Sequence, residues 1–181
     1  MAYIKIDESL PGIRGLMSFS PYTATPLNAL AELLLRSDVG LTKGERELIA
    51  TYVSYLNECF FCQRIHGAVA QYYFNNVDED LVRKVKENYK SAPISDKLKF
   101  LLAIAENVQK GGKYVKIEQV EEAKKFGTTD LEIHDTVLIA AAFCMFNRYV
   151  DGMGTFAPEN PELYKQRAKR IAEETGYVNS I

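Results

Sequence analysis

Two copies of one helix-start signal constrain the fold of this 181-residue chain more than any other feature. Thr42-Lys-Gly-Glu45 and Thr129-Asp-Leu-Glu132 both match the capping box, in which a threonine and a glutamate three residues later cap a helix. A long apolar helix is expected after each box. Elsewhere apolar residues recur at helical spacing, and no alternating stretch longer than a few residues indicates a strand. The pattern therefore predicts an all-α fold.

Caps, glycines and prolines divide the rest of the chain into further helices. Thr25-Pro26 has the form of a helix start, with a capping residue before a proline at the first helical position. Asn57 is expected to cap a helix that begins at about Glu58. Residues 1–22 look irregular, and residues 23–181 are expected to form a single helical domain. The later helices are expected at approximately residues 42–56, 58–75, 78–89, 95–110, 117–126, 129–152 and 161–175.

The composition is that of an ordinary globular domain, with 47% hydrophobic and 25% charged residues. A net charge of -2 argues against a general binder of nucleic acids or anionic membranes, since both rely on excess positive charge. The longest apolar run, residues 136–146, is too short to span a membrane. Lys5, Asp7 and Glu8 stand where a signal peptide would be apolar, so a cytoplasmic location with reduced thiols is expected.

The arrangement of the cysteines is the strongest functional signal. Cys59 and Cys62 form a C-x-x-C pair, and on a helix from Glu58 onward they share one face with His66. Cysteines at this spacing have Cα atoms roughly 5–6 Å apart, which is within the span of a disulfide. The pair lies in the first turn, where the helix dipole favours a thiolate. These residues therefore suit thiol redox chemistry.

A carboxylate on the preceding helix is expected to complete this site. Glu47 lies on a helix that is apolar nearly all round, and a carboxylate buried there needs a partner. It stands ten residues before Asn57, and His66 stands nine residues after it. If the chain reverses at Asn57 into a helical hairpin, both groups lie about 14–15 Å from the turn and face each other. Glu47 would then orient His66, and His66 would take the proton of Cys62.

The four residues resemble a known motif. Glu47, eleven residues, Cys59-Phe-Phe-Cys62, three residues and His66 follow the E-x11-C-x-x-C-x3-H pattern of the AhpD-like alkylhydroperoxidases, within the carboxymuconolactone decarboxylase family. The stretches 51–59 and 146–152 are similar to its peroxidase-related branch. The resemblance covers approximately residues 27–155. It implies an AhpD-like helical bundle that assembles as a homo-oligomer, a trimer or a hexamer.

The resemblance also implies roles for these residues. Cys62 would be the peroxidatic cysteine that a hydroperoxide substrate oxidises to a sulfenic acid, and Cys59 would resolve it as a disulfide. An external dithiol would reduce the disulfide, without a cofactor or a metal. Glu47 and His66 would relay the proton. Phe61 departs from the pattern, because the well-studied members carry a histidine immediately before the second cysteine, so the expected relay is shorter.

Two other interpretations of the cysteine pair stay open. In a non-catalytic helical oligomer, Cys59 and Cys62 would serve as a redox-sensitive latch. In a zinc-binding module, Cys59, Cys62 and His66 would supply three ligands, but a structural site needs a fourth and the chain has no second cysteine pair. Cys144, the third cysteine, lies in an apolar segment and is expected to pack in the core.

Overall fold

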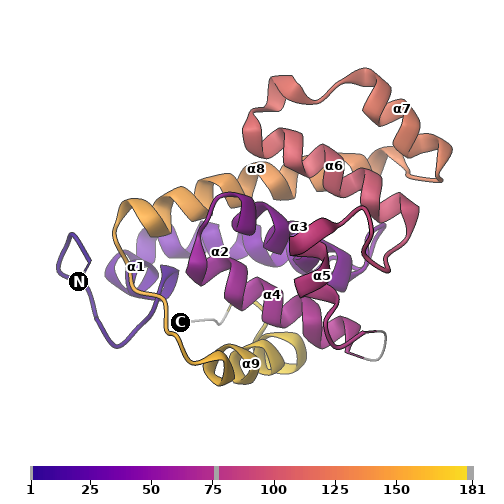
Figure 1. Ribbon diagram of the computed structural model, residues 1–181. Coiled ribbons are helices and arrows are strands. Elements are labelled where there is room, and N and C mark those ends of the chain that lie inside the picture. Colours follow the sequence, from indigo (N-terminus) through magenta and orange to yellow (C-terminus); the bar gives the residue numbers. More distant parts are fainter. Residues whose placement is uncertain (1, 76–77, 179–181) are drawn as a thin grey trace.

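Helices form nearly all of the regular structure in the computed structural model, which describes residues 2–75 and 78–178 (Figure 1). No strand occurs in these two ranges, so the predicted all-α class is confirmed. The elements are α1 (Ile13–Phe19), α2 (Pro21–Arg36), α3 (Lys43–Leu56), α4 (Phe60–Phe74), α5 (Leu81–Asn88), α6 (Asp96–Lys110), the 3-10 helix η1 (Gly112–Tyr114), α7 (Ile117–Lys125), α8 (Asp130–Gly152), α9 (Pro161–Arg170) and the π-helical turn η2 (Ile171–Thr175).

Helix α3 lies at the centre of the bundle. It packs against α4, α6 and α8, and its side chains Leu48, Ile49 and Val53 are fully buried. The chain reverses between α3 and α4, so that these two helices pack against each other and form the predicted helical hairpin. Helix α9 covers the side of α4 that faces away from α3 (Figure 1). The first turn of α4, with its cysteine pair, therefore lies between two packed layers.

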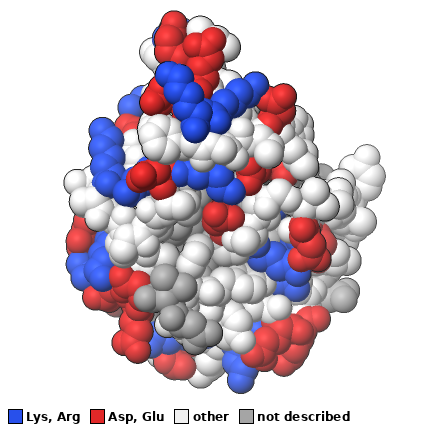
Figure 2. Space-filling view, turned by 90° about the vertical axis from the view of Figure 1, so that its right-hand side faces the viewer, with Lys and Arg blue, Asp and Glu red and all other residues white. Residues whose placement is uncertain are grey.

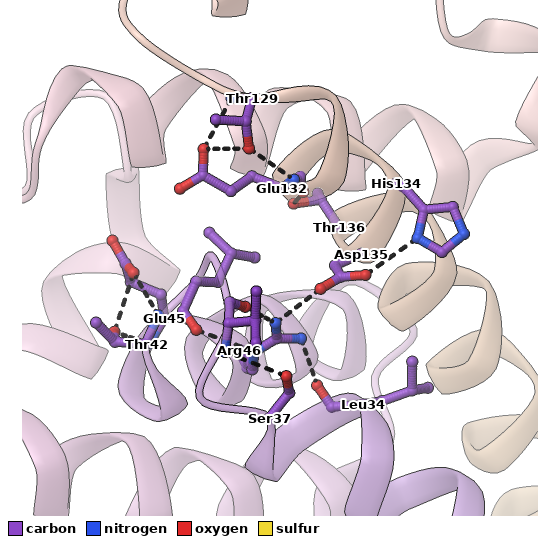
Figure 3. Close-up of polar contacts among 12 residues, drawn as sticks. Leu34, Ser37, Thr42, Glu45, Arg46, Thr129, Glu132, His134, Asp135 and Thr136 are labelled. Carbon is purple, nitrogen blue, oxygen red and sulfur yellow. Dashed lines mark hydrogen bonds and ion pairs between the residues drawn. The ribbon is translucent and has the colours of Figure 1, made fainter.

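Both predicted capping boxes are formed (Figure 3). The backbone N–H of Glu45 donates to the Thr42 hydroxyl at 3.2 Å, and the Glu45 carboxylate accepts from the backbone N–H of Thr42 at 2.9 Å. In the second box the backbone N–H of Glu132 donates to the Thr129 hydroxyl at 3.2 Å, and the Glu132 carboxylate accepts from the backbone N–H of Thr129 at 2.8 Å. Each box satisfies backbone donors that the first turn of a helix leaves without partners. The starts of α3 and α8 are thus set by local sequence.

A buried arginine, which the sequence pattern does not single out, connects these two helix starts (Figure 3). Only 1% of Arg46 is exposed. Its guanidinium donates to the backbone carbonyls of Leu34, Val39 and Leu41 at 2.9, 2.6 and 3.1 Å, and to the Asp135 carboxylate at 2.7 Å. A buried charge is tolerated only when it is paired and hydrogen-bonded. Arg46 therefore joins the α2–α3 connection to α8.

The expectation that residues 1–22 are irregular is wrong for residues 13–19, which form α1. This helix has no side-chain cap, and its order comes from packing, because Leu16 and Met17 are buried. Gly12, just before it, has a φ of 58°, and a Cβ added there would lie 2.2 Å from the Phe61 ring. A glycine is therefore required where the N-terminal segment passes over the start of α4.

The start of α2 is also earlier than predicted. Proline does occupy the first helical position, but it is Pro21, preceded by Ser20, and not Pro26. Pro26 lies inside the helix, and the hydroxyl of Thr25 donates to the Pro21 carbonyl at 3.2 Å instead of capping a new helix. Ser20-Pro21 and Thr25-Pro26 both have the form of a helix start. The helix begins at the first of them, because α2 follows directly after α1.

Two other helix ends differ from the expected positions. Helix α5 starts after Asp80 and not after Asp78, whose carboxylate instead accepts a hydrogen bond from the backbone N–H of Asp80 at 2.9 Å. The expected helix over 161–175 is α-helical only to Arg170 and widens into η2. This change of helix type sets the direction in which the C-terminal segment leaves the bundle.

The described surface has a mixed charge. On the face shown in Figure 2, Lys and Arg side chains alternate with Asp and Glu side chains and form no large patch of one sign. Within residues 2–75 and 78–178, none of the helices has the length and apolar character needed to cross a membrane.

Candidate active site

A tight reversal places the cysteine pair at the start of α4. Glu58 has a φ of 57°, and the backbone N–H groups of Glu58 and Cys59 donate to the carbonyls of Tyr55 and Ser54, both at 3.0 Å. Helix α4 therefore begins at Phe60 and not at Glu58 as predicted, and Cys59 is its N-cap residue. The left-handed backbone at Glu58 ends α3 and makes a continuous helix impossible. Cys62 occupies the first turn, as predicted.

The left-handed backbone at Glu58 is expected to lower the stability of the fold, and substitutions at this residue measure by how much. A left-handed conformation is unfavourable for residues with a Cβ, so Glu58→Gly is expected to raise the free energy of unfolding over that of Glu58→Ala by roughly 1 kcal/mol. Urea denaturation of the two variants and the wild type measures this difference. Equal stability of the glycine and alanine variants would show that the turn is not strained at this residue.

The two cysteines differ in their surroundings. Both are free thiols and both are buried, with 0% of Cys59 and 3% of Cys62 exposed. Cys62 lines an apolar cavity of about 60 Å³, together with Phe61, Ile65, His66, Phe143 and Tyr177. The neighbouring Cys62 thiol, burial and the nearby charge of Asp151 raise the pKa of the Cys59 thiol far above its usual value. Cys59 therefore stays protonated, while Cys62 faces the space that a small molecule can enter.

Asp151 lies three residues after Arg148, a spacing at which two residues on a helix can pair, but its carboxylate lies near Cys59. In the structure the Arg148 guanidinium donates to the Cys144 carbonyl at 2.9 Å. Burial raises the pKa of Asp151, and a contact with the Cys59 thiol partly offsets this rise. The end of α8 thus contributes an acidic group to the cysteine pair. Cys144 itself is buried in α8.

The structure brings Glu47 and His66 together, as the hairpin arithmetic predicts. His66 Nδ1 lies 2.8 Å from Glu47 Oε2, and both side chains are buried. The imidazole packs edge-on against Phe143, with ring centroids 4.7 Å apart. The Glu47 carboxylate holds Nδ1, so Nε2 is the ring nitrogen left for other contacts. The His66 side chain lines the same cavity as Cys62.

Tyr177 is a third member of this group, and no local pattern in the sequence identifies it. Its hydroxyl donates to Glu47 Oε1 at 2.6 Å and lies 3.2 Å from His66 Nδ1. Its ring stacks on the imidazole, with centroids 5.6 Å apart. Burial and the adjacent Glu47 carboxylate raise the pKa of Tyr177 well above its usual value, so the phenol remains a proton donor to Glu47.

The C-terminal segment is held in place by contacts that bring Tyr177 into the site. The backbone N–H of Tyr177 donates to Glu32 at 2.6 Å, and Arg36 donates to the Ala172 carbonyl at 3.3 Å. Gly176 has a φ of 55°, and a Cβ there would lie 2.4 Å from Glu32 Oε2. The chain therefore turns at Gly176 after η2, and the turn directs Tyr177 into the bundle.

The predicted site residues do not form a metal site in the described part of the chain. Among residues 2–75 and 78–178, no three His, Cys, Asp or Glu side chains gather in a metal-binding arrangement. Nothing in this geometry favours the zinc-binding alternative.

Comparison with known proteins agrees with this arrangement. The model of the carboxymuconolactone decarboxylase family matches residues 21–72. A solved structure described as the alkylhydroperoxidase AhpD core of an uncharacterized peroxidase-related protein from Ralstonia eutropha JMP134 has a TM-score of 0.77 and 28% identity, over 86% of this chain and 81% of that one. The chain is therefore similar to the carboxymuconolactone decarboxylase family over residues 21–72 and to an AhpD core in its fold.

A second solved structure has a similar fold. An uncharacterized peroxidase-related protein from Silicibacter sp. TM1040 has a TM-score of 0.76 and 24% identity, over 86% of this chain and 78% of that one. No curated protein matches the chain. The segment that matches the carboxymuconolactone decarboxylase model contains Glu47, Cys59, Cys62 and His66, but not Tyr177. Tyr177 therefore lies outside the segment that the family model covers.

Proposed function

We propose that this protein is a thiol-dependent hydroperoxide reductase in which Cys62 is the peroxidatic cysteine. The observation that carries the proposal is the shared cavity: Cys62 and His66 line it together, and His66 is held by Glu47 at 2.8 Å. The arrangement supplies a nucleophile, a base and a group that orients the base. The match of residues 21–72 to the carboxymuconolactone decarboxylase model and the similarity in fold to an AhpD core support the same general activity.

The first step oxidises Cys62. His66 takes the thiol proton, the Cys62 thiolate attacks the terminal oxygen of the hydroperoxide, and the O–O bond breaks as the S–O bond forms. The imidazolium then returns the proton to the departing alkoxide. The products are the sulfenic acid of Cys62 and an alcohol, so sulfur loses two electrons and the peroxide gains them. Glu47 stabilises the imidazolium that exists between the two transfers.

The second step forms the disulfide. The Cys59 sulfur attacks the sulfenic sulfur of Cys62, the thiol proton joins the departing hydroxide, and water leaves. An external dithiol then attacks the cavity-facing sulfur of Cys62 and reduces the disulfide by thiol–disulfide exchange. Cys59 suits the resolving role because its raised pKa keeps it protonated during the first step. Asp151, near Cys59, is placed to take the Cys59 proton first and to pass it to the departing hydroxide.

An assay of turnover separates this proposal from a redox-sensitive latch. With cumene hydroperoxide and excess dithiothreitol, we expect many equivalents of peroxide to be consumed per protein, and mass spectrometry to find a Cys59–Cys62 disulfide when dithiol is absent. Consumption that stops at one equivalent despite excess dithiol would favour the latch. A protein whose cysteines stay reduced in peroxide would contradict both.

Tyr177 is proposed to act as a positioning residue for the His66–Glu47 pair. Tyr177→Phe removes the proton donor to Glu47, so the less compensated carboxylate holds the proton on His66 more strongly. We expect Cys62 oxidation to slow about tenfold at neutral pH, and the midpoint of its rise with pH to move up by about one unit. Rapid-mixing measurements of Cys62 oxidation across pH provide the test.

Tyr89→Phe is the matched control for this prediction. Tyr89 also donates to a glutamate, Glu106, at 3.3 Å, but outside the cavity. The Tyr89 variant is expected to keep the wild-type pH profile. A Tyr177 variant with an unshifted profile, whatever its stability, would remove Tyr177 from the mechanism.

Assembly and location remain proposals. We propose a homo-oligomer, a trimer or a hexamer, in the cytoplasm, on the basis of the resemblance to the AhpD-like proteins. Light scattering coupled to size-exclusion chromatography measures the number of copies. A monomer at micromolar concentration would contradict the assembly.

A further inference from the structure

Arg14, at the start of α1, is a charged side chain without a partner. It makes no hydrogen bond or ion pair with the described part of the chain, and its Nε is buried without an acceptor. Burial and the nearby charge of Arg170 lower the pKa of Arg14. A guanidinium in this setting lacks the anion that normally compensates it.

Arg14 borders two adjacent spaces. The inner cavity is the 60 Å³ space that Cys62 and His66 line. The outer hollow, of about 590 Å³, is lined by apolar side chains that include Phe156 and Leu163, and by Arg170 at its rim. Both spaces share four lining residues, namely Arg14, Phe61, Ile65 and Arg167. The outer hollow therefore lies next to the cavity of the proposed peroxidatic cysteine, and these four side chains border both.

The lining of the two spaces selects for a molecule with two chemical properties. Phe61, Ile65 and Leu163 favour an apolar chain, because contact with them removes hydrocarbon from water. Arg14 offers unused N–H donors, whose planar arrangement matches the two oxygens of a carboxylate. A neutral peroxide would use the apolar lining but would leave Arg14 without an acceptor.

We propose that the Arg14 site binds the carboxylate of an aliphatic hydroperoxy acid, and that it thereby positions the hydroperoxide group in the inner cavity at Cys62. The carboxylate of the ligand lies beside Arg14, between the inner cavity and the outer hollow. The rest of its hydrocarbon chain occupies the outer hollow. The inference rests on the proposed function for its reactive step, but the anion site itself does not. Binding and oxidation are therefore measured separately.

Binding is measured without any oxidation. Isothermal titration of the reduced protein with octanoate is expected to show one site, and 1-octanol is expected to bind at least about tenfold more weakly, because it lacks the charge-assisted hydrogen bonds. Arg14→Gln should remove the preference for octanoate, and Arg14→Lys should restore part of it. Arg83→Gln is the control, since Arg83 is exposed and already paired with Asp80 and Glu87.

Oxidation is measured with a medium-chain hydroperoxy acid and its methyl ester, in single-turnover experiments without dithiol. The wild type is expected to react at least about tenfold faster with the acid than with the ester, and Arg14→Gln is expected to react equally with both. Equal rates in the wild type, or octanoate binding that Arg14→Gln leaves intact, would overturn the anion site. Arg14-dependent octanoate binding without oxidation of Cys62 by any hydroperoxide would support the anion site and overturn the proposed peroxidase.

Discussion

Cys62→Ser is expected to lower hydroperoxide consumption by about a thousandfold or more, because a serine hydroxyl cannot replace the thiolate that attacks the O–O bond. Cys62 is the cysteine that lines the cavity beside His66, and its loss removes the nucleophile and leaves the base intact. Peroxide consumption with excess dithiothreitol measures the effect. The folded state is checked by circular dichroism, since serine is close to cysteine in size.

The other two cysteines provide matched controls. Cys59→Ser is expected to allow one oxidation of Cys62 per protein, trapped as a sulfenic acid that dimedone labels, and to abolish steady turnover. Cys144→Ser is expected to keep wild-type turnover, because Cys144 is buried in α8 outside the cavity lining. Full activity of Cys62→Ser, or loss of the first oxidation in Cys59→Ser, would reverse the roles proposed for the pair.

Arg46→Met is expected to lower the free energy of unfolding by about 3–5 kcal/mol, the range seen when one partner of a buried ion pair is removed. The substitution keeps much of the apolar side-chain volume, but it leaves the Asp135 carboxylate and three backbone carbonyls without their donor. Urea denaturation at neutral pH measures the change.

An exposed arginine with two acidic partners is the control for Arg46. Arg83→Met also breaks two ion pairs, with Asp80 and Glu87, but all three side chains are more than half exposed. Ion pairs in water contribute little, so this variant is expected to stay within about 1 kcal/mol of the wild type. Similar free energies of unfolding for Arg46→Met and Arg83→Met would show that the hydrogen bonds of Arg46 do not stabilise the fold.

The fold class and the two helix starts with capping boxes were predictable, because both depend on residues within a few positions of each other. Thr42 and Glu45 meet across one turn of helix wherever that helix lies in the molecule. The helix over residues 13–19 was missed for the opposite reason. It has no capping side chain, and its buried Leu16 and Met17 are ordered by the rest of the bundle.

The candidate site was also predictable only in part, and for the same reason. Glu47 and His66 were paired from the sequence because a single hairpin separates them, and distances along two helices from one turn can be calculated from the rise per residue. The exact start of α4 was not predictable, since the left-handed backbone at Glu58 is uncommon for a residue with a side chain.

The sequence by itself determined the all-α class, the two helix starts with capping boxes and the relative positions of Glu47, Cys59, Cys62 and His66, since these follow from short-range spacing along the chain. Only the tertiary structure decided that Tyr177 reaches His66 from 111 residues away, that Arg46 meets Asp135, and that Arg14 borders the cavity of Cys62. The physical reason is that contacts between distant segments depend on how all the helices pack together, and no local spacing records that outcome.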